Sequence, residues 1–309
     1  MVEWARLRHA YGSAEDVPGL LASLRAADEA ERHEAFGELY NSITHQGNRY
    51  SASAAAVPSL LELIADPSTP DREFLLVLLG RIAVGLDEAW LPGGVRTDLL
   101  DEDGLRAYEA VGAGLPVLLP LLAEPELADS AAYVIGWYRG EHAALAVHGS
   151  PTSIVACGLA GSTPRTADDS PLMRWAGAIA AARLLGTAAG DDVRAELLDW
   201  AASGRERDHT VPYLEGDLAG YALLSLPLVG VDAFEPALAR LRQVSAEPAL
   251  TALGVALRQA FPDGPVDGRL TPRQQRLVQV VAENPSAGLY DGVEFANFSL
   301  LLAEYGLPR

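Results

Sequence analysis

The histidines and the single cysteine are the side chains that could coordinate a metal. Cys157 is the one thiol, and histidine occurs as His9, His33, His45, His142, His148 and His209. Zinc sites combine several His, Cys or carboxylate ligands, and two histidines on one helix face stand three or four residues apart. No two histidines of this chain have that spacing, so we predict no metal site.

His33 and Glu34 form one histidine–carboxylate pair, and Glu141 and His142 repeat it in the reverse order. A dinuclear iron centre needs several such ligands that converge, so these pairs do not predict one. The sequence also lacks the GxxxxGK[ST] and GxGxxG phosphate-binding loops and the GxSxG serine elbow. We therefore predict no catalytic residues and no cofactors, and we expect a protein that binds rather than catalyses.

Side chains suited to binding occur in three short stretches of the sequence. Trp, Tyr and Arg dominate binding surfaces because they bury a large area and keep a polar group. Both tryptophans in these stretches would suit the core equally well, and residues 45–50 would equally suit a loop that satisfies its own polar groups. The candidate binding residues are Glu38, His45, Gln46, Arg49, Tyr50, Trp137, Tyr138, Arg139, Arg174 and Trp175.

The charge of the chain narrows the class of partner. All 23 basic residues are arginine, and 42 acidic residues leave a net charge of -19. Nucleic-acid binding gains most from Lys and Arg at the phosphates, so we expect no nucleic-acid partner and no anionic membrane. We expect a protein partner, and the charge favours a basic one. A small-molecule ligand remains open, and an acidic surface also serves solubility alone.

The expected location follows from the apolar segments. Residues 1–11 lack the basic start and apolar core of a signal peptide. Charged residues, Gly or Pro interrupt every apolar stretch before the roughly 18 residues that span a bilayer. We therefore expect a cytoplasmic protein, with Cys157 buried as a small apolar side chain in the run 154–159.

Helices must position these candidates, because Ala, Leu and Val dominate the hydrophobic residues and aromatics make up only 7% of the chain. One helix start recurs at Pro18, Pro58 and Pro116, where an apolar residue precedes the proline and Leu-Leu follows one residue later. The apolar spacing matches one face of a helix. Proline suits the first helical turn, so we predict that each helix starts there. A second helix, rich in Ala and Gly, follows each one after an acidic corner.

The spacing of these starts predicts a repeat of ~40 residues. Pro18 and Pro58 are 40 residues apart, and Pro58 and Pro116 are 58 apart. We assign the excess to an acidic loop insertion over 87–104, whose Pro, Gly and carboxylate content is typical of a loop. Weaker copies of the first helix begin near Pro151, Val193 and Pro236, which gives about six helical hairpins.

The Pro-x-Leu-Leu helix, the acidic or Arg corner and the Ala- and Gly-rich second helix resemble the HEAT-like repeat family, in particular the bacterial type found in phycobilisome lyases. The resemblance covers about residues 16–261 and is strongest at 56–85 and 114–138. It implies an all-α superhelix, an armadillo-type α-solenoid that binds partners on a concave wall of second helices, often as a scaffold. Near Pro236 the chain departs from the pattern, because Arg242 replaces the Leu or Ile of earlier copies.

The chain after residue 261 changes character. Residues 262–270 are rich in Pro, Gly and Asp and predict a linker. Thr271, Pro272 and Gln274 match a capping box, which predicts a helix through Ala282. A solenoid of residues 1–261 exposes an apolar end, so we predict that residues 271–309 form a C-terminal helical cap. The alternative is a flexible tail, against which its aromatic content speaks.

These observations favour a non-enzymatic protein-interaction module that uses the concave face, such as an acidic inhibitor or immunity-type partner of a basic protein. The alternative is a small-molecule-binding protein or enzyme with a pocket near the first and third repeats, around His45, Tyr50, Trp137 and Tyr138. A closed apolar pocket would favour the ligand, and an open groove with charged rims would favour the protein.

Overall fold

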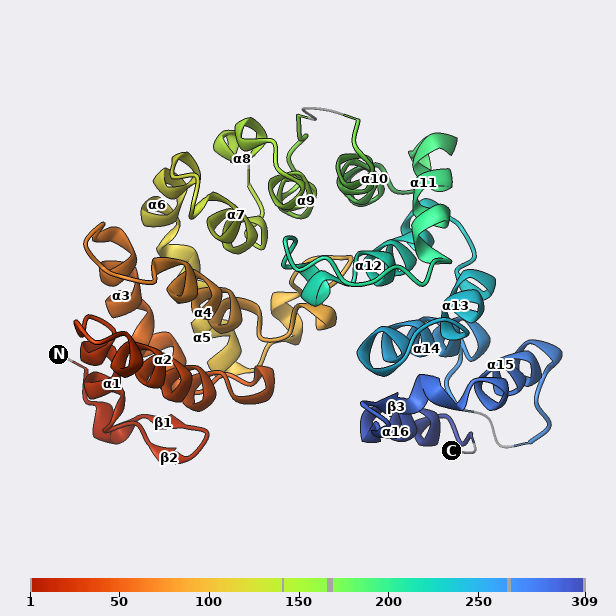
Figure 1. Ribbon diagram of the computed structural model, residues 1–309, viewed down its shortest axis with the longest axis horizontal. Helices are drawn as coiled ribbons and strands as arrows, with labels where there is room; N and C mark the ends of the chain where they lie inside the picture. Colours follow the sequence, from red (N-terminus) through yellow and green to blue (C-terminus); the bar gives the residue numbers. More distant parts are fainter. Residues whose placement is uncertain (1, 141, 166–168, 266–267, 308–309) are drawn as a thin grey trace. The chain divides into compact units, whose positions relative to one another are not determined.

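The computed structural model shows a chain that is mostly helical, which confirms the all-α class (Figure 1). The structure describes residues 2–140, 142–165, 169–265 and 268–307. The chain divides into two compact units, 1–167 and 168–309, which we call the N-terminal and C-terminal units. Their boundary falls inside the range 1–261 that we predicted as one solenoid.

The N-terminal unit contains nine of the described α-helices and one short hairpin. The antiparallel hairpin joins β1, Arg8–His9, to β2, Gly12–Ser13, with Arg8 opposite Ser13. Short 3-10 turns connect several helices, among them η2 at His45–Gly47 and η5 at Leu119–Ala123. The helices are α1 Val17–Ser23, α2 Glu29–Ile43, α3 Ser51–Ala65, α4 Arg72–Val84, α5 Glu102–Ala113, α6 Leu115–Leu118, α7 Ala128–Gly136, α8 Ala143–His148 and α9 Pro151–Ala160.

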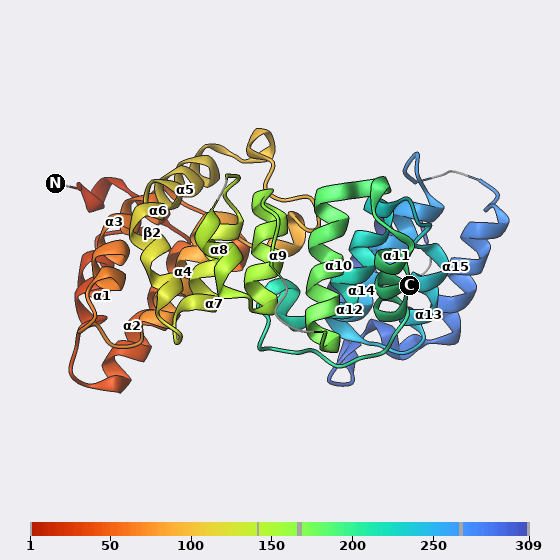
Figure 2. The same ribbon diagram turned by 90° about the horizontal axis from the view of Figure 1, so that it is seen from above.

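Helices of this unit pack in two layers. One row consists of α1, α3 and α6, in which α3 contacts both of the others (Figure 1 and Figure 2). The helices that follow them, α2, α4 and α7, form a second row, in which α4 contacts both of the others. Helix α9 packs closely on α7, where a Cβ at Gly136 would lie only 2.7 Å from the Cα of Ala156. Small residues therefore permit close helix contact here, as the composition suggested.

The C-terminal unit contains the remaining described helices and a second hairpin. Its antiparallel strands are β3, Leu289–Tyr290, and β4, Val293–Glu294. Helices α10, α12, α14 and α16 contact one another in turn, and α11, α13 and α15 pack against them. The helices are α10 Pro171–Leu185, α11 Asp191–Ala201, α12 Leu218–Ser225, α13 Phe234–Leu241, α14 Ala246–Ala260, α15 Pro272–Glu283 and α16 Ala296–Glu304.

We predicted that a helix begins at each of three prolines, and one of these three predictions is wrong. Pro18 and Pro116 lie in the first turns of α1 and α6, but Pro58 lies in the middle of α3. Helix α3 begins earlier because the Ser53 hydroxyl accepts a hydrogen bond from the Tyr50 backbone N–H at 2.8 Å, which caps the helix at Tyr50. Pro58 is exposed, so its ring points to solvent.

The weaker repeat copies do correspond to helices. Helix α9 begins at Pro151, where the Ser150 hydroxyl accepts from the Ser153 N–H at 3.1 Å, and α11 and α13 begin at Asp191 and Phe234. Within the predicted insertion 87–104, the chain forms two 3-10 turns, and α5 starts at Glu102. The predicted loop therefore ends too late, because the Asp101 carboxylate caps α5 by accepting from the Gly104 N–H at 2.7 Å.

Residues at the C-terminal end fold onto α14. The capping box at Thr271 and Gln274 is confirmed, since each side chain bonds the other's backbone N–H, and α15 continues through Glu283. Both α15 and α16 contact α14. The predicted linker 262–270 includes residues 266–267, which lie outside the described residues.

Among the residues that the structure describes, no single helix is long and apolar enough to cross a membrane. One pair of helical segments, Glu102–Ala113 and Leu115–Ala123, has the length and apolar composition of a membrane span when the two are taken together, but they are bent by 46° relative to each other.

Candidate functional site

Three of the predicted binding side chains lie in the core. Trp137 is 2% exposed, Tyr138 is 7% exposed and Trp175 is fully buried. The Trp175 indole N–H donates to the Leu218 carbonyl at 2.9 Å, so its polar atom is also satisfied inside the protein. We therefore reassign all three from the binding surface to the core, where large rings gain most from burial.

Tyr138 connects the end of α7 to α5. Its ring stacks on Tyr108 with centroids 4.5 Å apart, and its hydroxyl donates to the Tyr108 carbonyl at 2.8 Å. The Tyr108 hydroxyl in turn donates to the Trp137 carbonyl at 2.8 Å. Burial raises the pKa of both phenols, because water no longer solvates the phenolate.

This burial predicts a loss of stability in alkali. The pKa of Tyr138 is raised in the folded state above its ordinary value of 10.0, so the unfolded chain loses the proton first. The stabilisation is complete below about pH 10 and is lost as pH rises above it. Denaturant unfolding between neutral pH and about pH 11 should show this decline, and Tyr138→Phe should flatten it relative to Tyr11→Phe, which removes an exposed phenol. Equal slopes in the two variants would contradict the assignment.

Arg49 has a structural role in the N-terminal unit. Its Nη1 donates to the Gly47 carbonyl at 2.7 Å. A Cβ at Gly85 would lie 2.1 Å from Nη1, and a Cβ at Gly104 would lie 2.8 Å from Nη2. Burial lowers the pKa of Arg49, and the Asp101 carboxylate partly opposes that shift. The half-buried guanidinium thus lies between the turn after α2, the end of α4 and the start of α5, and its role as a binding residue stays a prediction.

The rest of the segment 45–50 is a loop with internal contacts. The His45 Nδ1 lies 3.2 Å from the hydroxyl of Tyr11, and the two rings meet edge to face at 5.4 Å. Gln46 is exposed in the left-handed region, with φ of 51°. Tyr50 is the N-cap residue of α3, and its backbone N–H donates to the Ser53 hydroxyl. This matches the alternative of a loop that satisfies its own polar groups.

Three predicted residues remain at the surface. Glu38 is exposed on α2, and Arg139 is exposed just after α7. Arg174 on α10 donates to Glu196 at 3.2 Å and to the Asp169 carbonyl at 2.7 Å. The second member of the reversed pair, His142, donates from Nε2 to the Tyr138 carbonyl at 3.0 Å. Glu141 lies outside the described residues.

A group of exposed and half-buried rings lies where α2 contacts α4 (Figure 1). His33, Phe36 and Tyr40 come from α2, and Phe74 and Val77 come from α4; we call these five residues the aromatic patch. Phe74 lies 5.7 Å from His33 and 5.6 Å from Phe36 between ring centroids, and Phe36 lies 6.0 Å from Tyr40. Phe74 is 42% exposed and Val77 is 45% exposed.

Carboxylates border the aromatic patch. The His33 Nε2 lies 4.0 Å from Glu29 Oε1 and 3.9 Å from Asp71 Oδ2. Asp71 also accepts a hydrogen bond from Arg32 Nε at 2.7 Å. Glu73 is exposed on α4, directly before Phe74 and one helical turn before Val77. Rings beside carboxylates can hold a cation, because the ring faces attract it and the carboxylates accept its hydrogen bonds.

Our sequence reasoning found Glu38 on this helix but missed the rings. The available signal was the spacing of His33, Phe36 and Tyr40, which places them along one side of a second helix. We favoured tryptophan as a binding residue instead, although tryptophan, with the largest ring, is also well suited to fill a core.

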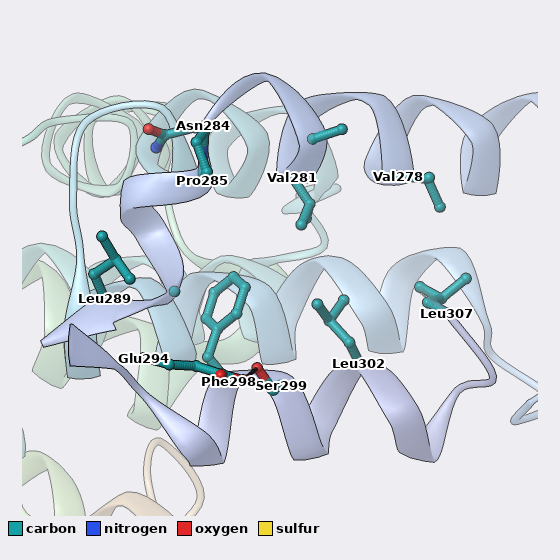
Figure 3. A pocket seen from close by; sticks show the side chains of 12 residues that line it. Val278, Val281, Asn284, Pro285, Leu289, Glu294, Phe298, Ser299, Leu302 and Leu307 are labelled. Atoms are coloured by element: carbon teal, nitrogen blue, oxygen red, sulfur yellow. Dashed lines mark hydrogen bonds between the residues drawn. The ribbon is translucent and has the colours of Figure 1, made fainter. Parts of the chain in front are cut away.

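The C-terminal unit contains a pocket of 480 Å³ between α15, α16 and the β3–β4 hairpin (Figure 3). Most of its lining is apolar, including Val281, Phe298 and Leu302. Our alternative placed a pocket around His45, Tyr50, Trp137 and Tyr138; the pocket in Figure 3 instead lies near the C-terminus. Among the described residues, no three His, Cys, Asp or Glu side chains gather as metal ligands.

No family model and no curated protein matches the sequence. Among solved structures, the chain is similar to two engineered proteins from the Northeast Structural Genomics Consortium. One shares 17% identity over 87% of this chain and 98% of its own, with a TM-score of 0.34. The other shares 17% identity over 94% and 89%, with a TM-score of 0.29. Likeness at this level defines neither a fold nor a function for this chain.

Proposed function

We propose that this chain is a non-enzymatic protein-interaction module of the HEAT-like solenoid type, and that its aromatic patch docks a basic segment of a partner protein. Within each unit, most helices fall into two rows whose members contact one another along the row, and α5 in addition packs on both α3 and α4. Stacked helical hairpins have this pattern of contacts. In the N-terminal unit, the patch lies on the row of second helices.

The observation that carries the proposal is an exposed aromatic surface bordered by carboxylates. Soluble proteins bury most Phe and Val side chains, so Phe74 and Val77 side by side on one helix indicate a surface that is covered in a complex. Three carboxylates, Glu29, Asp71 and Glu73, lie beside this surface, and one of them, Asp71, is paired with Arg32. An apolar centre with a charged rim is the usual composition of a protein interface.

Charge complementarity identifies the occupant as a segment that contains Arg or Lys. A guanidinium or ammonium group can stack on the ring of Phe74 while it donates hydrogen bonds to Asp71 or Glu29. The net charge of -19 would attract a basic protein from a distance and raise its association rate. An acidic inhibitor of a basic protein is one form of this function.

Phe74→Ala should weaken binding of a basic peptide about tenfold, the effect expected for an interface residue of moderate importance. The probe is a fluorescently labelled peptide of alternating Arg and Gly, and fluorescence anisotropy measures its affinity. Phe74→Ala leaves the net charge unchanged, so long-range attraction cannot explain a loss. A peptide with citrulline in place of Arg should bind much more weakly, because it keeps the shape and lacks the charge.

Val147→Ala is the matched control, because Val147 is 73% exposed on α8 of the same unit and lies outside the patch. It should bind the peptide as the wild type does. The proposal is overturned if Phe74→Ala and Val147→Ala bind equally well, or if the wild type shows no preference for Arg over citrulline.

A further inference from the structure

The pocket of the C-terminal unit has the size and lining of a small-molecule site. Its volume of 480 Å³ lies within the range of known ligand pockets. Val278 and Val281 on α15 face Leu302 and Leu307 across the space, and the ring of Phe298 forms part of the floor (Figure 3). An apolar group bound between these side chains would gain free energy from its burial, and it would find no hydrogen-bond partner among them.

Among the polar residues that line the pocket, Glu294 and Ser299 lie together beside Phe298, whereas Asn284 lies on the opposite side, at the end of α15 (Figure 3). The Ser299 hydroxyl donates to Glu294 Oε1 at 2.7 Å. Asn284 donates through its amide to the Leu241 carbonyl and accepts from the Ser286 hydroxyl at 2.7 Å. Serine and asparagine are therefore already engaged within the protein.

Glu294 decides the chemistry of the pocket. It is the one charged side chain among the described residues that line the pocket. A carboxylate has about four acceptor positions, of which Ser299 occupies one, so it can accept more hydrogen bonds from a ligand. The pocket therefore combines mostly apolar walls with one anionic acceptor, Glu294, which is also exposed to solvent.

We propose that this pocket binds a small amphiphilic cation, with an ammonium or amidinium head at Glu294 and an apolar body between Val281 and Leu302. The head would donate to the Glu294 carboxylate, and the body would displace water from the aliphatic walls. A fatty acid or another anionic amphiphile would place like charges together at Glu294. This site is independent of the aromatic patch, which lies in the N-terminal unit.

Isothermal titration calorimetry with octylammonium, octanol and octanoate tests the charge preference on the full chain. We expect octylammonium to bind about tenfold more tightly than octanol, the factor for one hydrogen bond to a charged group, and octanoate to bind more weakly still. Glu294→Gln keeps an acceptor for Ser299 and should remove the difference between octylammonium and octanol. Equal affinity for the ammonium and the carboxylate in the wild type would overturn the proposal.

Glu304→Gln is the matched control for general attraction to an acidic protein. Glu304 is exposed on α16 outside the pocket lining, so its loss removes the same charge and should leave the preference for octylammonium intact. Val278→Trp fills the cavity and should weaken all three probes. Because that variant could fold poorly, nuclear Overhauser effects in the wild type give a second readout. Contacts between the octyl chain and the Phe298 ring support the site, and their absence with bound ligand refutes it.

Discussion

Arg240→Met should lower the free energy of unfolding by about 3–5 kcal/mol, because it leaves a buried carboxylate without its partner. The side chains of Arg240 and Asp217 are 1% and 4% exposed, and Arg240 Nη2 lies 2.5 Å from Asp217 Oδ1. Arg240 Nη1 also donates to the Ser203 carbonyl at 2.5 Å. Denaturant unfolding followed by circular dichroism measures the loss.

Two further variants separate the buried charge from ordinary side-chain loss. Arg242→Met removes an arginine that is 38% exposed and 4.0 Å from Glu283, so it should cost less than about 1 kcal/mol. Adding Asp217→Asn to Arg240→Met should recover much of the stability, because the amide is neutral and can still accept from the Gly220 N–H that caps α12. If Arg240→Met costs no more than Arg242→Met, the buried pair is not the cause.

The start of a helix was predicted correctly where all the residues that determine it lie within one short segment of the sequence. The capping box at Thr271 and Gln274 and the proline at Pro151 both start helices as expected. At Pro58, the local signal was misleading, because Ser53 had already started the helix. Pro58 lies inside α3 with its side chain exposed, and this position in the helix is not visible in the spacing of the apolar residues.

The division of the chain could not be read in the same way. Proline, glycine and aspartate indicated a boundary at 262–270, whereas the division into two compact units falls between residues 167 and 168 of the sequence. Compactness depends on which distant helices contact one another, such as α4 with α7 or α12 with α14. The composition of a single segment does not indicate which distant helices it contacts.

The candidate site shows the same limit at the level of single residues. Trp175 and Phe74 are both aromatic residues on helices, yet Trp175 is fully buried and Phe74 is 42% exposed. Their difference comes from their neighbours, since Trp175 contacts Trp200 and Tyr221, which lie far along the chain. The surroundings of Arg49 could not be read from the sequence for a similar reason, because Gly85 and Gly104, which lie against its guanidinium, are far along the chain.

Trp175→Ala should lower the free energy of unfolding by about 3–5 kcal/mol, because it opens a cavity in the core of the C-terminal unit. The Trp175 ring lies 6.1 Å from Trp200 and 6.0 Å from Tyr221 between centroids, and its N–H donates to Leu218 at 2.9 Å. Trp175→Phe keeps much of the volume and should cost less than Trp175→Ala. Leu198→Ala, at a side chain 37% exposed, is the control and should cost about 0.5 kcal/mol or less. Denaturant unfolding gives the order of the three variants, and hydrogen exchange should show the loosening in α10 and α12. A cost for Trp175→Ala as small as that of Leu198→Ala would mean that Trp175 is not a core residue and would return it to the candidate binding surface.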